Sequence, residues 1–378
     1  MKLVYCIAGT YNSGGMERVL ANKANYWVRH GHEVTIVTTD QQGRMPFFEL
    51  DERIDCFDLG VNYEENNGKS FWNKLVCYPF KQWKHKVCLT ALLKRLRADV
   101  VISMYCNDVS FIVGIHDGSK KVLEVHFSRF KRLQYDRKGL WRVADAWRSR
   151  MDEKVAKRFH RFVVLTQEDK TYWGDLPNIE VIPNAIVSLP DKPAALKNPK
   201  AIAIGRYTHQ KGFDYLIDAW VSVHRVHPHW QLNIVGDGEC REALQKQIND
   251  NHLQGVVHLL PATNRVDEIY SGASLLVMSS RYEGLPMVLL ESLAYGLPIV
   301  SFACQCGPAD VVTDGVNGFL VPQGNINLLS EKLIQLMGDD VLRRQMGQAA
   351  REKVMRFTEN KVMGMWMELF DQLLMKER

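Results

Sequence analysis

The sequence lacks the long apolar runs that mark membrane-spanning or exported chains. A transmembrane helix needs about 18 or more consecutive apolar residues, and the sequence contains no such run. The apolar stretch Leu3–Ala8 is too short for the core of a signal peptide, and polar residues follow it from Thr10 onward. We therefore expect a chain that neither spans a membrane nor is secreted by that route.

Motifs for metals, redox cofactors and disulfides are also missing. The eight cysteines include no Cys-x-x-Cys pair, and Cys304-x-Cys306 has no companion His or Cys pair at zinc spacing. No Asp-x-Asp triplet occurs, so nothing favours a metal-bridged diphosphate. The absence of Gly-x-Gly-x-x-Gly disfavours a nicotinamide cofactor. We expect no metal and no cofactor, in a protein of the reducing cytoplasm.

The composition is that of an ordinary globular protein without a strong charge of either sign. Of its 378 residues, 46% are hydrophobic and 24% are charged, and the formal net charge is +5. A chain of this length is expected to form two domains that each bury a core. Because the net charge is small, what matters is where the basic residues are grouped.

Apolar runs of strand length alternate with helical patterns along the chain. This alternation predicts an α/β protein with parallel sheets and right-handed crossovers. A polar stretch with several prolines, Ser188–Lys200, separates two such series and is interpreted as the domain linker. The expected strands are Leu3–Ala8, Val34–Thr38, Val100–Met104, Val122–His126 and Phe162–Thr166 before the linker, and Ala201–Ile204, Leu232–Val235, Val257–Leu260, Ala273–Met278 and Ile299–Phe302 after it.

Two glycines follow the first expected strand. Gly14 and Gly15 lie between Leu3–Ala8 and a helical pattern that begins at Met16. Bare backbone at such a turn can approach a phosphate or a sugar. The alternative is a helix start whose glycines serve packing alone.

Two carboxylates stand eight residues apart around another expected helix start. Glu283 precedes Pro286, which fits the first helical position, and Glu291 lies just over one turn into the helix. The free amides near residues 285–288 form an anion site suited to a diphosphate. Because a carboxylate only accepts hydrogen bonds, Glu291 suits the hydroxyls of a ribose and Glu283 those of a second sugar. The alternative is a solvated loop glutamate beside an amphipathic helix.

Cations and glycines occupy the loops after the first strands of the second series. Arg206 and Lys211 flank the turn after Ala201–Ile204, where arginine binds a diphosphate through two bonds and lysine acts as a point charge. The turn at residues 236–238, Gly-Asp-Gly, presents backbone that can lie against a flat ring. The alternatives are exposed basic loop residues and an ordinary turn.

Two segments combine basic residues with aromatic ones. Solvated helix faces give this pattern, and it also suits the surface of an anionic membrane. No nucleic-acid-binding module accompanies the charge, so no nucleic-acid partner is expected. The segments are Phe71–Arg97 and the stretch between His126 and Phe162, which includes Arg129, Lys131, Arg132, Arg137, Lys138, Trp141, Arg142, Trp147, Arg148 and Arg150.

In their order along nearly the whole chain, these motifs resemble those of family 4 of the glycosyltransferases, retaining enzymes of the GT-B fold. Glu283 and Glu291 match the family's Glu-x7-Glu signature, and the Gly14-Gly15 turn matches a loop that closes over the donor. The resemblance implies two Rossmann-like α/β/α domains facing an interdomain cleft. Residues 1–187 would bind the acceptor and 201–357 the donor. A last helix, at about 358–378, would cross back to the first domain or else pack on its own domain.

The resemblance also implies site residues. His126 corresponds to the histidine of a Glu-His pair that contacts the donor sugar, although a lone histidine at a strand end is more often structural. The spacing Glu124-Val125-His126 matches that pair only loosely, so Glu124 is left out. Catalytic roles are expected for His126, Arg206, Lys211 and Glu283. Donor binding is expected for Gly14, Gly15, Asn184, Gly205, Gly236, Asp237, Gly238, Leu260, Gly284, Leu285, Pro286, Met287, Val288 and Glu291.

The implied activity is transfer of a hexose or N-acetylhexosamine, with retention, from a nucleotide sugar to a lipid-linked or glycan acceptor in surface-glycan synthesis. A UDP-linked donor is expected because it is frequent in the family. The protein is expected in the cytoplasm, at the inner face of the cell membrane. Arg206, Lys211 and the helix amides would stabilise negative charge on the leaving diphosphate. Two alternatives stay open: a sugar-nucleotide epimerase of the same fold, and a catalytically silent partner protein that binds the donor.

Overall fold

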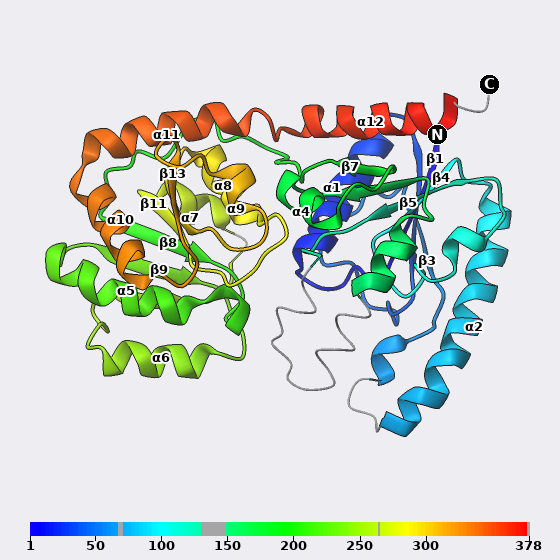
Figure 1. Cartoon of the computed structure of the whole chain (residues 1–378), viewed down its shortest axis with the longest axis horizontal. Coiled ribbons are helices and arrows are strands. Elements are labelled where there is room, and N and C mark those ends of the chain that lie inside the picture. The colour runs from blue at the N-terminus through cyan, green and yellow to red at the C-terminus, as the bar shows by residue number, and fades with distance from the viewer. Residues whose placement is uncertain (67–70, 130–148, 264, 376–378) are drawn as a thin grey trace. The chain divides into compact units, whose positions relative to one another are not determined.

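The computed structural model describes residues 1–66, 71–129, 149–263 and 265–375. The chain divides into two compact α/β units (Figure 1). The first comprises residues 1–165, 173–182 and 363–378, and the second comprises residues 166–172 and 183–362. Each unit contains its own parallel sheet flanked by helices.

The first unit is built on a parallel sheet. Seven strands in the described part of the chain lie in the order β3-β2-β1-β4-β5-β6-β7. The inner strands are short, apolar and buried, as expected where helices cover both faces of a sheet. The strands are β1 (Lys2–Ile7), β2 (Glu33–Thr38), β3 (Asp55–Asp58), β4 (Val100–Ser103), β5 (Lys120–Glu124), β6 (Arg161–Val164) and β7 (Ile179–Val181).

Helices pack on the two faces of this sheet because successive strand residues point to opposite sides. On one face, the rings of Trp27 and Phe370 pack with centroids 5.6 Å apart. On the other, Leu89 and Leu93 share a buried cluster with Phe162. The helices of this unit are α1 (Gly15–Arg29), α2 (Phe71–Leu96) and the C-terminal part of α12 (Glu359–Met375), whereas α4 (Gln167–Trp173) belongs mostly to the second unit.

The second unit repeats this plan. Its six described strands are parallel and lie in the order β10-β9-β8-β11-β12-β13. The direction in which the chain crosses the sheet therefore reverses between β8 and β11. The strands are β8 (Lys200–Ile204), β9 (Gln231–Val235), β10 (Val257–Leu260), β11 (Leu275–Met278), β12 (Ile299–Phe302) and β13 (Gly318–Val321).

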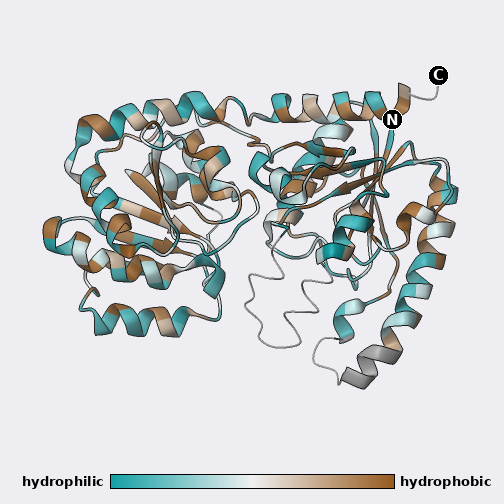
Figure 2. Cartoon of the chain, viewed as in Figure 1, coloured by the Kyte–Doolittle hydropathy of each residue, from teal (hydrophilic) through white to brown (hydrophobic). Residues whose placement is uncertain are grey.

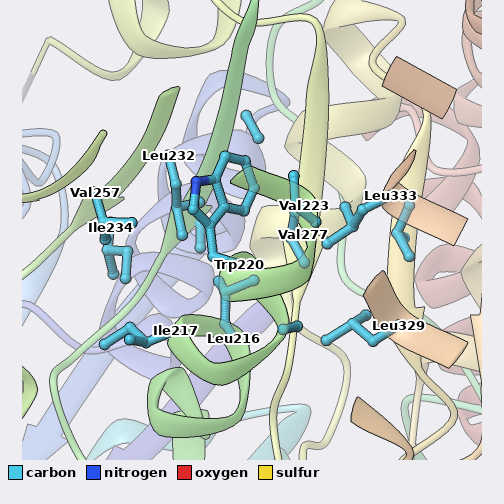
Figure 3. Close-up of a cluster of buried hydrophobic side chains, with 14 of the residues drawn as sticks. Leu216, Ile217, Trp220, Val223, Leu232, Ile234, Val257, Val277, Leu329 and Leu333 are labelled. Carbon is cyan, nitrogen blue, oxygen red and sulfur yellow. The ribbon is translucent and has the colours of Figure 1, made fainter. Parts of the chain in front are cut away.

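The core of the second unit is centred on a tryptophan. Trp220 is fully buried, and Figure 3 shows its indole ring among aliphatic side chains that include Leu232 and Val277. Truncating such a buried aromatic residue typically costs about 3–5 kcal/mol. The helices of this unit are α5 (Phe213–Val226), α6 (Arg241–Asp250), α7 (Val266–Ser271), α8 (Met287–Tyr295), α9 (Pro308–Val311), α10 (Ile326–Gly338), α11 (Asp340–Val354) and the start of α12.

The structure differs from the sequence-based description at several places. Strands β3 and β7 were not expected, since both are short and only partly buried and so carry little apolar pattern. The stretch 188–200 is not a free connection, because it groups with the second unit and buries Ala194 and Leu196. The N–H of Ala194 donates to the carbonyl of Tyr295 at 2.8 Å. Packing of an irregular segment leaves no periodicity in the sequence.

Hydropathy follows this architecture. Figure 2 shows hydrophobic strands in both sheets and mixed hydrophilic and hydrophobic residues along the helices. Both observations agree with amphipathic helices that bury one side against a sheet. Among the helices that the structure describes, none is long and apolar enough to cross a membrane.

Candidate functional site

The carboxyl edge of the second sheet carries most of the expected donor-binding residues. Open α/β sheets bind ligands outside the carboxyl ends of their strands, at the point where strand order reverses. In this unit that point lies between β8 and β11. Lys211 is in the loop after β8, and Glu283 is in the loop after β11. The topology therefore brings these two loops to the same place.

Lys211 and Glu283 form an ion pair there. Nζ of Lys211 lies 2.7 Å from Oε1 of Glu283, and the hydroxyl of Ser280 donates to the same oxygen at 2.6 Å. Glu283 is 7% exposed, and a carboxylate so buried needs charged or hydrogen-bonding partners. Its other oxygen makes no hydrogen bond with the residues described. The pair is the charged centre of the candidate site.

The backbone of Glu283 is held by the segment that follows β12. Its N–H donates to the carbonyl of Gln305 at 2.8 Å, and the N–H of Cys306 donates back to the carbonyl of Glu283 at 3.2 Å. Two reciprocal bonds fix the direction in which the Glu283 side chain leaves the loop. The carboxylate is therefore placed by backbone contacts as well as by Lys211.

Arg281, which belongs to no motif of the sequence, ties the two loops together. Its guanidinium donates to both carboxylate oxygens of Asp214, at 2.8 and 2.5 Å, and to the carbonyl of His209 at 2.7 Å. It also lies 4.1 Å from the ring centre of Tyr215. Burial raises the pKa of Asp214, but the contact with Arg281 outweighs it and leaves that pKa below its usual value. No local pattern predicts this pairing.

The helix after Glu283 begins one residue later than expected. α8 starts at Met287, so Pro286 is the N-cap residue, with φ −71° and ψ 120°, and not the first helical residue. The fixed φ of proline suits both positions, and its extended ψ decides between them. No side chain caps this helix, and its first turn contains no acidic residue. The amides of Met287 and Val288 thus keep the anion-binding character expected of a helix N-terminus.

Asn184 contacts the loop before α8. Its Nδ2 donates to the carbonyl of Leu285 at 3.3 Å, and its side chain is buried. The amide oxygen of Asn184 is also buried but has no hydrogen-bond partner in the described chain. An unsatisfied buried acceptor costs free energy. This oxygen is therefore suited to accept from a ligand hydroxyl beside Leu285 and Gly284.

Glu291 lies in a buried cluster of tyrosines. The hydroxyl of Tyr270 donates to Oε2 of Glu291 at 2.6 Å, and Glu291 is 7% exposed. The ring of Tyr270 stacks on that of Tyr295 with centroids 5.1 Å apart. These contacts orient the Glu291 carboxylate. Tyr270 and Tyr295 were not found from the sequence, because no motif links them to Glu291.

The glycines of this edge are required by the fold itself. A Cβ on Gly236 would lie 1.9 Å from the carbonyl oxygen of Gly205, and one on Gly238 would lie 2.5 Å from that of Tyr207. The Tyr207 hydroxyl donates to the carbonyl of Leu260 at 2.6 Å, and burial raises the pKa of Tyr207 to about 12. The Leu260 carbonyl is thus engaged within the protein. Close backbone packing accounts for these glycines without a ligand.

Arg206 and Asp237 are exposed at this edge. The guanidinium of Arg206 makes no hydrogen bond or ion pair with any residue of the described ranges. Asp237 is 65% exposed and lies 3.7 Å from Arg241. Arg206 is therefore open to a ligand, whereas Lys211 is already paired. No group of three or more His, Cys, Asp or Glu side chains that could hold a metal ion occurs in the described part of the chain.

Gly14, Gly15 and His126 belong to the first unit, whereas Asn184 and the later site residues belong to the second. Gly14 is the N-cap residue of α1, and Gly15 is the first residue of that helix. A Cβ on Gly15 would meet no described atom within 4 Å. Packing with the described residues does not explain this glycine, and its backbone has room for a ligand.

His126 lies just beyond β5, which ends at Glu124. Its Nε2 is 2.9 Å from Oε1 of Glu124. Glu124, which was not among the expected site residues, is 1% exposed and accepts hydrogen bonds from Nζ of Lys23 at 2.6 and 2.5 Å. Burial raises the pKa of Glu124, but Lys23 and His126 outweigh it and lower that pKa to about 2. Glu124 is thus a charged neighbour of His126, although it was not predicted as a site residue because the motif matches only loosely.

The expected basic and aromatic surface is described only in part. Residues 131–148, which include Lys131 to Arg148 of the second segment, lie outside the described residues. Arg129 is engaged within the protein: it donates to Glu153 at 2.9 Å and lies 5.2 Å from the ring centre of Trp173. Arg129 therefore serves packing, and it is not a free surface cation.

Helix α2 presents an apolar and basic side to solvent. Phe80, Trp83 and Val87 are 65%, 62% and 48% exposed, and the rings of Phe80 and Trp83 lie 6.0 Å apart. Their spacing of three and four residues puts them on one side of the helix. The helix sequence contains several lysines and no acidic residue, and Lys86 and Lys94 are exposed.

Comparison with known protein families gives two matches that adjoin along the chain. Residues 13–187 match the model described as Glycosyltransferase Family 4, and residues 188–353 match the model described as Glycosyl transferases group 1. Together the two matches cover both units except for their terminal segments.

Individual proteins extend this similarity over the whole length. The chain is 30% identical to an uncharacterized glycosyltransferase of Haemophilus influenzae, over 93% of this chain and 94% of that one. It is 27% identical to the amylovoran biosynthesis glycosyltransferase AmsD of Erwinia amylovora, over 98% and 99%. A crystal structure of a mutant of S. aureus TarM, in complex with fondaparinux, alpha-GlcNAc-glycerol and UDP, aligns with a TM-score of 0.77 at 17% identity, covering 98% of this chain and 99% of that one.

Proposed function

Because this chain belongs to the family 4 glycosyltransferases, we propose that it moves a hexose or N-acetylhexosamine from a UDP-linked donor to a lipid-linked or glycan acceptor. The proposed reaction retains the anomeric configuration and needs no metal ion. The acceptor is proposed to belong to surface-glycan synthesis, and the name of the AmsD relative places that protein in amylovoran biosynthesis.

The observation that carries the proposal is the contact between Lys211 and Glu283. It unites a cation suited to a diphosphate with a carboxylate suited to sugar hydroxyls, at the carboxyl edge of a parallel sheet. The uncapped start of α8 supplies backbone amides in the next segment of the same loop. A nucleotide sugar has this combination of anionic and hydroxyl-rich parts.

The proposed chemistry follows from where charge develops. When the bond between the sugar and the diphosphate breaks, negative charge grows on the departing oxygen. Lys211, the exposed Arg206 and the amides of Met287 and Val288 are the groups that would stabilise it. The acceptor hydroxyl attacks the same face of the sugar, and the departing phosphate takes its proton. No side-chain nucleophile is needed in this scheme.

The nucleotide half of the donor is assigned to Glu291 and its surroundings. A buried carboxylate oriented by Tyr270 is suited to accept from ribose hydroxyls. We propose uridine as the base, since UDP is the nucleotide named in the TarM complex. His126, Gly14 and Gly15, in the first unit, are proposed to meet the donor sugar.

The acceptor is proposed to be presented at the inner face of the cell membrane. The exposed side of α2 combines aromatic residues with lysines and no acids, which suits the interface of an anionic bilayer. This location fits a lipid-linked acceptor better than a freely diffusing one.

A panel of UDP- and GDP-sugars, assayed for nucleotide release with and without lipid-linked acceptor fractions, tests the proposal. The expected result is UDP release that increases when the acceptor is present, together with a labelled glycan product of retained configuration. The Lys211→Ala variant serves as the control for release that does not depend on the site.

Two other results would contradict the proposal. Conversion of one nucleotide sugar into another without any acceptor would identify an epimerase. Binding of UDP without turnover of any donor in the panel would identify a catalytically silent protein.

A further inference from the structure

A buried ion pair lies next to His126, on the side of the first sheet that α1 and α12 cover. Lys23 comes from α1 and Glu124 from the end of β5, and they are 5% and 1% exposed. Nζ of Lys23 lies 2.6 and 2.5 Å from the two oxygens of Glu124. Trp366 of α12 packs over the ammonium group, with its ring centre 4.0 Å from Nζ. The pair is thus sealed from water.

One edge of His126 faces this pair. Nε2 is buried and lies 2.9 Å from Oε1 of Glu124, with the length of an ion pair but without hydrogen-bond alignment. The carboxylate of Glu124 therefore lies directly beside this ring nitrogen. The other ring nitrogen, Nδ1, makes no hydrogen bond with a described residue and is left to meet a ligand.

The stability of the fold does not by itself explain a buried pair of a lysine and a glutamate. Buried ion pairs often stabilise a fold no better than well-packed apolar residues of the same size, because both charges must leave water. Replacing only one partner is costly, since the other charge is left buried without compensation. A lysine and a glutamate sealed beside an expected ligand-binding histidine therefore invite a functional explanation.

We propose that Lys23 and Glu124 are positioning residues for sugar transfer: Glu124 holds His126 in place through its charge, and Lys23 balances the charge of Glu124. This inference rests on the proposed function only through the role of His126 at the donor sugar. The same α1 that carries Lys23 begins at the Gly14-Gly15 turn. The ion pair thus fastens the helix with the glycine turn to the strand that precedes His126.

Few charged or titratable groups among the described residues act on the Glu124 carboxylate beside His126. Among the described residues, those that act on Glu124 are Lys23 from α1 and His126 after β5, and Glu124 in turn acts on Tyr5 of β1. Burial strongly raises the pKa of Tyr5, so its hydroxyl stays neutral. Trp366, from α12, brings a ring and no charge. Changes at Lys23 and Glu124 should therefore reach His126 directly.

The two partners should affect His126 in opposite directions. In Lys23→Met the carboxylate of Glu124 faces His126 alone, which favours the imidazolium form. In Glu124→Gln the ammonium of Lys23 faces it alone, which disfavours that form. We expect the titration midpoint of the His126 ring, followed by NMR, to lie about one pH unit or more higher in Lys23→Met than in Glu124→Gln. The double variant that combines Lys23→Met with Glu124→Gln keeps the charges balanced. Its titration midpoint should lie between those of the two single variants.

Transfer activity provides a second measurement. Both substitutions preserve side-chain length. Each single variant should be less stable than the wild type, because one charge stays buried without its partner, and should show a lowered kcat, with KM for the donor changed less. The double variant should recover part of the lost kcat, since it restores electrical balance. Lys121→Met is the matched control: Lys121 is buried and pairs with Asp117 in the same unit. It should leave the His126 titration unchanged.

Several results would overturn the proposal. Midpoints that coincide in the two single variants, or that move equally in Lys121→Met, would show that the pair does not govern His126. Activity that falls further in the double variant than in either single one would indicate a purely structural pair. If Lys23→Met does not fold, the proposal is still tested by comparing the His126 titration midpoint of Glu124→Gln with that of the double variant. The titration needs no substrate, so it stands even if the wild type transfers no sugar.

Discussion

Nζ of Lys211 lies 2.7 Å from Oε1 of Glu283, a residue 72 positions later in the chain. The cation assigned to the diphosphate and the carboxylate assigned to the sugar are therefore direct neighbours. Without a ligand each satisfies the charge of the other. A bound diphosphate would bring a second anion to Lys211, so the lysine is placed to respond as charge develops on the leaving group.

Lys211→Ala should lower kcat by about 10²–10³, by analogy with the loss of one preorganised donor at a developing charge. The measurement is nucleotide release at saturating donor. Lys246→Ala is the matched control, because Lys246 is 76% exposed in the same unit and, among the residues that the structure describes, pairs only with the exposed Asp250. A Lys211→Ala enzyme with wild-type turnover would remove this lysine from the mechanism.

The two glutamates should separate nucleotide binding from transfer. Glu291→Ala should weaken the binding of free UDP as well as of the donor, because it removes the carboxylate assigned to the ribose. Glu283→Ala should spare free UDP and damage transfer. The affinity of Glu291→Gln for UDP should lie between those of the wild type and Glu291→Ala, since an amide oxygen can still accept a hydrogen bond from Tyr270. Calorimetric titration of UDP into the three variants decides the matter, and equal weakening by both alanine variants would refute the assignment.

Activity should survive an excess of EDTA, since Arg206, Lys211 and the amides at the start of α8 are proposed to carry the role that a metal plays elsewhere. The assay compares nucleotide release before and after exhaustive chelation. Complete loss that only Mg²⁺ or Mn²⁺ restores would mean that the diphosphate has ligands other than those proposed.

The exposed side of α2 should bind anionic vesicles. Phe80→Ser combined with Trp83→Ser should reduce co-sedimentation with phosphatidylglycerol vesicles several-fold at low salt. Each lysine near such a surface adds about 1 kcal/mol, so binding by the wild type should also fall as salt rises. Val226→Ser combined with Val341→Ser, which removes two exposed apolar residues of the second unit, is the control. A wild type that ignores anionic vesicles would favour a soluble acceptor.

Acid should destabilise the first unit partly through Glu124. The pKa of this group is lowered to about 2 from an ordinary value of 4.5. A lowered pKa contributes stability at pH above the unfolded value, and that contribution is lost as pH falls from about 4.5 toward 2. Over this pH range the free energy of unfolding of Glu124→Gln should therefore decrease less steeply than that of the wild type. Urea titration at successive pH values measures both. Glu180→Gln, at a half-buried residue of the same unit whose side chain is 47% exposed, should leave the slope unchanged.

The sequence by itself determined the fold class and the family, and both predictions are confirmed. Strands and helices could be read from the sequence because burial on one or both faces leaves a local pattern of apolar residues. The strand Val257–Leu260 was predicted with the bounds that the structure has. The glycine turns and Glu283 and Glu291 could be found because their spacing lies within single segments. The roles proposed for the site residues stay predictions.

Only the tertiary structure decided which residues pair. Lys23 and Glu124 are 101 positions apart, and Arg281 and Asp214 are 67 apart. A charged residue in an apolar run has the same local pattern whether it faces solvent, a ligand or a buried partner. Its partner is set by strand order and by which loops meet at one edge of a sheet. Glu124 was left out because its spacing from His126 matches the family's pair only loosely. Its partner Lys23 lies on a helix that sequence spacing cannot connect to it, so no other local signal pointed to Glu124.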